Sequence, residues 1–139
     1  MLEELKRELS VIRYTLTDRQ DLLWLETEGT SITALAQIFR RQGGRLVSMS
    51  AMVSQDGEEV TIYYHFDIGG NLYNIKMDSQ DSTIASISPM FPNSEWFERE
   101  IRELYGVHFE GHPNPAPLFL NMGPQYPLKR LEKELIQSE

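Results

Sequence analysis

The alternation of apolar and polar residues predicts five strands in the first half of the chain. It is clearest over 59–67, where every second residue is apolar: Val60, Ile62, Tyr64 and Phe66. Successive side chains of a strand point to opposite faces, so this period indicates a strand with one buried face. Similar patterns predict strands over 11–16, 21–27, 45–54 and 72–77.

A period of three to four residues predicts helices before, between and after these strands. We expect a short helix over 1–9, a second over 31–42 that ends at Gly43-Gly44, and a third from Ser94 to Tyr105. The order helix-strand-strand-helix-strand-strand-strand predicts a two-layer α+β domain with a mixed sheet. We assign residues 1–88 to this core, and 89–139 to a helix and an extended arm of the same domain unit.

The helix from Ser94 has one carboxylate in an unexpected place. At about 100° per residue, Glu100 falls between Trp96 and Leu104, within the apolar side, while Glu98 falls at the edge of that side. A carboxylate among apolar side chains must be paired, protonated or hydrated. Two interpretations stay open for Glu100: a side chain that reaches solvent at the rim of the core, or an acid held for an arginine or lysine elsewhere.

The segment after this helix is rich in proline. Five of the seven prolines lie there, at Pro113, Pro115, Pro117, Pro124 and Pro127. Proline fixes its backbone and donates no hydrogen bond, so we expect an extended arm. The arm contains the apolar run Leu118-Phe119-Leu120 and has little core of its own, so we expect it to lie along a surface. The pattern from Leu128 allows a last helix.

Composition excludes several classes of function. The net charge of −8 argues against nucleic acid and against anionic lipid as a partner, since both need a basic face. The absence of cysteine excludes thiolate-bound iron–sulfur clusters, disulfides and thiol nucleophiles. No apolar run suits a membrane helix, and the start Met1-Leu2-Glu3-Glu4 is unlike a signal peptide. We therefore expect a cytoplasmic protein without direct membrane insertion.

The histidines do not form a convincing metal site. His108 and His112 are four residues apart, as zinc ligands on a helix are, but Gly106, Gly111 and Pro113 argue against a helix there. No nucleophile elbow or phosphate-binding loop is present either. We expect no catalytic, cofactor or metal site in this chain, and we expect His112 to bond backbone groups in a tight turn.

The stretch 98–113 carries a family resemblance. Its residues are Glu98-Arg99-Glu100, Glu103, Leu104-Tyr105, Gly106-Val107, Phe109 and Gly111-His112-Pro113. They resemble the signature of the C subunit of the respiratory NADH:quinone oxidoreductase (complex I) and its equivalents in energy-converting membrane-bound nickel–iron hydrogenases and formate hydrogenlyases. The segment 126–130 resembles a later Pro-Leu-Arg-Lys segment of that family. The chain departs from the family at 114–117, where an acid and two arginines typically follow.

The resemblance implies an accessory, non-catalytic subunit of a membrane-associated oxidoreductase. Such a subunit would brace the large subunit, which carries the quinone site or the nickel–iron centre, and would neighbour an iron–sulfur subunit. Iron–sulfur clusters, nickel and quinone would then belong to partner subunits, and the chain would be peripheral to the cytoplasmic membrane. The residues that we expect at contacts with other subunits are Glu98, Arg99, Glu100, Glu103, Tyr105, Phe109, His112, Pro113, Leu118, Phe119, Leu120, Lys129 and Arg130.

Two other classes of function stay open at the level of the sequence. A free-standing binding module or homo-oligomer would use the proline-rich arm on itself. A small-molecule enzyme would need a pocket that gathers titratable groups with perturbed pKa values. Copurification with iron, nickel or flavin subunits would favour the complex, and turnover by the isolated chain would favour the enzyme.

Overall fold

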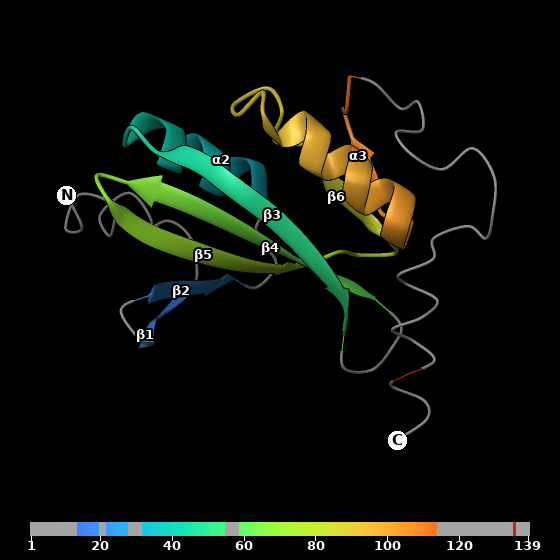
Figure 1. Ribbon diagram of the computed structural model, residues 1–139, viewed down its shortest axis with the longest axis horizontal. Helices are drawn as coiled ribbons and strands as arrows, with labels where there is room; N and C mark the ends of the chain where they lie inside the picture. Colours follow the sequence, from blue (N-terminus) through green and yellow to red (C-terminus); the bar gives the residue numbers. More distant parts are fainter. Residues whose placement is uncertain (1–13, 20–21, 28–31, 55–58, 114–134, 136–139) are drawn as a thin grey trace.

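The computed structural model describes residues 14–19, 22–27, 32–54, 59–113 and Leu135 (Figure 1). In the first two of these ranges only the backbone is described. Three predictions concern residues outside the described ranges: the helix over 1–9, the arm from residue 114, and all but one residue of the helix expected from Leu128.

A five-stranded mixed sheet forms the centre of the fold (Figure 1). Its strands are β1 (Tyr14–Arg19), β2 (Leu22–Thr27), β3 (Arg45–Val53), β4 (Val60–Ile68) and β5 (Asn71–Asp78). The spatial order is β1-β2-β5-β4-β3; β2 and β5 run parallel, and the other neighbours are antiparallel. The predicted α+β class is confirmed. The strand expected over 11–16 continues to Arg19, so its predicted end was too early.

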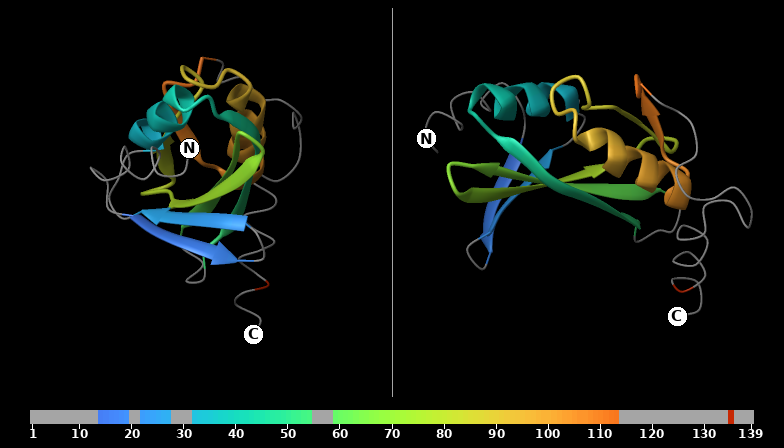
Figure 2. Two further views of the ribbon diagram at one scale, coloured as in Figure 1. Left: turned by 90° about the vertical axis from the view of Figure 1, so that its left-hand side faces the viewer. Right: turned by 45° about the horizontal axis from the view of Figure 1, so that its top comes forward.

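Two helices cover the same face of the sheet, as both views in Figure 2 show: α2 (Ile32–Arg41) and α3 (Ser94–Tyr105). Helix α2 buries Leu35, Ala36 and Phe39 completely, and the Phe39 ring stacks on Phe66 with 4.8 Å between centroids. The helix ends at Arg41, and Gly43 in the following turn has a φ of 76°. This is the stop that the pair Gly43-Gly44 predicted.

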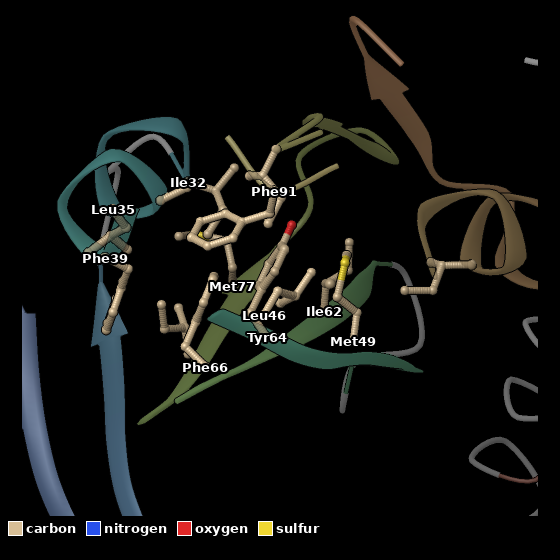
Figure 3. Packing of buried hydrophobic residues seen from close by; sticks show 14 of the residues in the cluster. Ile32, Leu35, Phe39, Leu46, Met49, Ile62, Tyr64, Phe66, Met77 and Phe91 are labelled. Carbon is tan, nitrogen blue, oxygen red and sulfur yellow. The ribbon is translucent and has the colours of Figure 1, made fainter. Parts of the chain in front are cut away.

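The core lies between the sheet and these helices (Figure 3). Strand β4 is central to it, and its five inward-facing residues are all fully buried: Val60, Ile62, Tyr64, Phe66 and Ile68. Residues of the last third of the described chain join the same core, namely Ile101, Tyr105, Val107 and Phe109. The segment after residue 88 therefore packs into the core that the sheet provides.

The opposite face of the sheet is more polar. Thr61 Oγ1 donates a hydrogen bond to Asp78 Oδ1 at 2.6 Å, and His65 Nδ1 lies 2.5 Å from Asn74 Oδ1. These pairs cross from β4 to β5, as neighbouring positions of one face should. His65 therefore lies on the more polar face of β4.

A second, two-stranded parallel sheet joins β6 (Thr83–Ala85) to β7 (His108–Glu110), which follows α3. Neither strand was predicted, because three residues are too few to show an alternating pattern. Helix α3 stops at Gly106, which has a φ of 77° and donates its N–H to the Arg102 carbonyl at 2.8 Å. The predicted helix end is confirmed. No helix in the described part of the chain is long and apolar enough to cross a membrane.

Candidate functional site

The centre of the signature stretch is Glu98, whose side chain is fully buried on the inner side of α3. Its Oε1 accepts a hydrogen bond from the Ser86 hydroxyl at 2.6 Å, and its Oε2 accepts one from the Ile87 N–H at 2.9 Å. Ser86 Oγ also lies 2.9 Å from Ser88 Oγ. The carboxylate therefore fixes the segment 86–88, which precedes the helix in sequence, against the helix.

His112 lies on the other side of this carboxylate. Its Nε2 is 4.0 Å from Glu98 Oε1 and 3.0 Å from the Glu95 carbonyl oxygen. A carbonyl can only accept, so Nε2 must carry a proton in this contact. The His112 N–H donates to the Phe109 carbonyl at 3.2 Å, which closes the turn. The prediction that His112 bonds backbone groups is confirmed.

The environment of Glu98 disfavours its charged form. Burial raises the pKa of the Glu98 carboxyl, and the hydrogen bonds from Ser86 and Ile87, the nearby His112 ring and the Ser94 hydroxyl oppose part of that rise. The same charge adds to the effect of burial in raising the pKa of Tyr64. A carboxyl that is buried, accepts two hydrogen bonds and borders a histidine is a structural anchor that is sensitive to protonation.

The prediction that Glu100 lies within the apolar side of the helix was wrong. Glu100 is exposed, and Trp96, which was assigned to the same side, is 61% exposed. The buried side of α3 instead consists of Ser94, Glu98, Ile101 and Tyr105. The reason is that the segment 86–88 offers an O–H and an N–H to a carboxylate, so the helix turns Glu98 inward.

The outer side of α3 has its own arrangement. The Arg99 guanidinium lies 5.4 Å from the centre of the Trp96 ring, within the range of a cation–π contact. Glu100 is exposed one turn after Trp96, and Glu103 is half-buried. An exposed tryptophan beside charged groups of both signs is typical of the residues that dominate protein–protein contacts.

The other predicted contact residues differ in their exposure to solvent. Tyr105 and Phe109 are buried in the core of this chain, and Pro113 is exposed. The structure thus brings together Glu98, His112 and the backbone of Glu95, and it separates them from Glu100. The predictions for Leu118, Phe119, Leu120, Lys129 and Arg130 fall outside the described residues. Whether any of these residues contacts another subunit stays a prediction.

The partners of Glu98 could not be foreseen from the sequence. Ser86 and Ser88 lie in the polar stretch 78–88, in which the isolated residues Ile84 and Ile87 follow no clear period. Tyr64 was assigned correctly to the buried face of its strand, but its proximity to a charge was not predicted. Within the described part of the chain, no three histidine, aspartate or glutamate side chains are close enough to hold a metal ion.

Comparison with known proteins identifies the family. The family model described as "Respiratory-chain NADH dehydrogenase, 30 Kd subunit" matches residues 25–134, which is most of the chain. The chain belongs to this family. The signature helix, its glycine stop and the Gly-His-Pro turn all lie within the matched range, and the resemblance drawn from residues 98–113 is confirmed.

Individual relatives match over shorter stretches. The C subunit of the NADH-quinone oxidoreductase of Caulobacter sp. (strain K31) is 39% identical over 44 residues, 32% of this chain and 21% of that protein. The C/D subunit of the same enzyme from Aeromonas hydrophila is 31% identical over 77 residues, 52% of this chain and 13% of that protein. The match therefore spans well under two thirds of these relatives.

Two solved structures share the fold. A chain in the structure of the membrane-bound sulfane sulfur reductase, an archaeal respiratory membrane complex, superposes with a TM-score of 0.75 at 16% identity, covering 96% of this chain and 82% of that one. A trypsin-resistant fragment of Nqo5 gives a TM-score of 0.62 at 18% identity, covering 81% of this chain and 95% of that one. At these identities the likeness concerns the fold alone.

Proposed function

We propose that this chain is a non-catalytic subunit of a membrane-associated, multisubunit oxidoreductase, and that it braces the large subunit of that complex. In such assemblies the large subunit holds the quinone site or the nickel–iron centre. Iron–sulfur clusters, nickel and quinone would be held by the large subunit and a neighbouring iron–sulfur subunit, not by this chain. The chain would then be cytoplasmic and peripheral to the membrane through the complex.

The observation that carries this proposal is the division of α3 into two faces. The inner face, with Glu98, is buried against the rest of the chain. On the outer face, the side chain of Trp96 is 61% exposed, beside Arg99 and Glu100. A large aromatic side chain is costly to leave in water, and exposed tryptophan is enriched in the centres of protein interfaces. The outer face of the signature helix is thus the best-suited contact surface in the described part of the chain.

The names of the relatives support the choice of partner. The matched protein of Aeromonas hydrophila is named as a C/D subunit, a name that joins two subunits in one protein. A chain of this family therefore has another subunit as its natural neighbour, and we assign the outer face of α3 to the large subunit.

The test is an affinity pull-down of the tagged chain from its native membrane. Trp96→Ala should reduce recovery of the large subunit strongly, because truncation of a central interface tryptophan typically costs about 2 kcal/mol or more. Glu100→Gln should also reduce recovery if a cation of the partner faces it. Leu72→Ala is the matched control, since Leu72 is 42% exposed but lies on β5, away from α3.

Glu95→Gln provides a second control, because Glu95 contributes its backbone carbonyl, and not its carboxylate, to the turn at His112. Equal recovery with wild type, Trp96→Ala and Glu100→Gln would reject α3 as the contact surface. Recovery of no iron-, nickel- or flavin-containing subunit with the wild-type chain would reject the proposed function itself.

A further inference from the structure

Two hydroxyl groups between the sheet and α3 are buried and make no hydrogen bond of normal geometry with any described residue. They are the Tyr64 hydroxyl on β4 and the Ser94 hydroxyl at the start of α3, and both residues are fully buried. Native proteins pair nearly all buried polar groups, either with protein atoms or with ordered water. A hydroxyl left unpaired has lost its bonds to solvent and gained none in return.

The two hydroxyls belong to opposite layers of the fold, Tyr64 to the sheet and Ser94 to the helices. Ser94 lies one helical turn before Glu98 on the inner side of α3. Its hydroxyl interacts with the carboxylate, outside the geometry of a normal hydrogen bond, and this interaction lowers the pKa of Glu98. Tyr64 lies in the middle of β4 and is close enough to feel the Glu98 charge, which adds to burial in raising its pKa. Figure 3 shows the Tyr64 hydroxyl pointing away from the sheet, toward the layer that contains Phe91.

The chemistry of these groups selects the ligand. The phenol and the serine hydroxyl can each donate or accept, and the carboxylate accepts, so the three offer both kinds of bond. A buried water typically makes about three hydrogen bonds to such groups. Glu98 would repel an anion, and a hard cation such as Ca²⁺ needs roughly six or more oxygen ligands.

We propose that one water molecule is bound between the Tyr64 hydroxyl, the Ser94 hydroxyl and the Glu98 carboxylate. This water joins the centre of the sheet to the signature helix. Glu98 then has two functions in the fold: it holds the segment 86–88 directly, and it holds β4 through the water. The helix face that carries Trp96 is positioned by both connections.

The experiment uses the full-length chain and two measurements. A high-resolution crystal structure of the wild type should show an ordered water within hydrogen-bond distance of the Tyr64 hydroxyl and of Ser94 or Glu98. The variant Tyr64→Phe removes only the phenolic oxygen and should lower the folding equilibrium constant by roughly five- to thirtyfold in denaturant titrations. The water should be absent from the crystal structure of this variant.

Tyr63→Phe is the matched control, because Tyr63 lies next to Tyr64 on β4 but directs its hydroxyl to the Met52 sulfur at 3.6 Å, on an exposed part of the surface. It should change the folding constant by no more than about twofold. Ser94→Ala is a second probe of the same site and should also lower the constant. The proposal is overturned if Tyr64→Phe folds as stably as the wild type or more stably, or if the wild-type map shows no water at this place.

Discussion

Glu98 and Glu100 lie two residues apart on α3, but their surroundings in the fold are opposite. Glu98 is fully buried with two hydrogen-bond donors, while Glu100 is exposed. The difference is one of available partners, because a carboxylate is tolerated inside a protein only where donors replace the water that it loses. At the residue scale, the role of each acid follows from what faces it across the fold.

Glu98→Ala tests this difference directly. The change leaves the Ile87 N–H and the Ser86 hydroxyl buried without their acceptor, and each such loss costs about 1–3 kcal/mol. We expect the free energy of unfolding, measured by urea titration, to fall by at least about 2 kcal/mol. Glu100→Ala, on the exposed side, should change it by no more than about 0.5 kcal/mol. Equal effects of the two substitutions would contradict the assignment.

The pH dependence of stability provides a second test of Glu98. Burial raises its pKa in the folded state above the ordinary value of 4.5, so the folded chain holds this proton more tightly than the unfolded chain. The resulting stabilisation is present below the unfolded pKa and is lost as the pH rises through the folded pKa. Relative to Glu98→Gln, which has no such proton, the wild type should therefore lose stability as the pH rises above about 4.5. A wild-type advantage that grows with pH would mean that the folded-state pKa is lowered instead.

At the scale of elements, the connection between β5 and β6 is a strained turn. Asp81 and Ser82 have φ values of 51° and 57°, and Gln80 and Thr83 exchange backbone hydrogen bonds around them. Positive φ at both central residues is typical of a type I′ turn, which favours glycine in the second position. The turn places the Ser82 carbonyl where the His108 N–H donates to it at 2.7 Å, so it also starts the β6–β7 sheet.

Ser82→Gly should therefore stabilise the chain. Glycine adopts positive φ without the steric cost that serine has, and the expected gain is about 0.5 kcal/mol after its larger loss of chain entropy. Thermal unfolding followed by circular dichroism measures the change. Ser82→Ala is the control, because alanine keeps the steric cost at this φ and should give no gain. A loss of stability in Ser82→Gly would show that the serine side chain matters more than its backbone.

At the scale of the whole molecule, the chain combines a buried carboxylate, Glu98, with an exposed helix face around Trp96. The core continues from β4 through α3 to β7, so the inner face of the signature helix is already occupied by its own domain. Glu98 and Tyr105 are therefore placed to support the fold, and the exposed residues around Trp96 form the contact surface that we propose. The sequence signature joins both tasks on one helix.

We expect the purified chain to bind no iron, nickel, zinc or flavin in stoichiometric amounts. The reasons are the absence of cysteine from the sequence and the position of His112, whose Nε2 proton is directed to the Glu95 carbonyl. Elemental analysis and absorption spectra of the isolated chain provide the measurement. One metal ion per chain, retained after dialysis against a chelator, would contradict this expectation.

The sequence by itself determined the parts of the fold that depend on local pattern. The α+β class, the clean alternation of β4, the end of α2 before Gly43 and the end of α3 at Gly106 could all be predicted, because each depends on residues that are neighbours in sequence. The family could also be predicted, since its signature is a continuous stretch.

Only the tertiary structure decided which carboxylate is buried. A helical pattern gives the angle between Glu98 and Glu100, but it does not show which side meets donors, and those donors come from Ser86 and Ile87 in another segment. The parallel pairing of β2 with β5 and the β6–β7 sheet depend in the same way on contacts between distant residues. The burial of a charge is a property of its surroundings, and those are assembled only when the chain has folded.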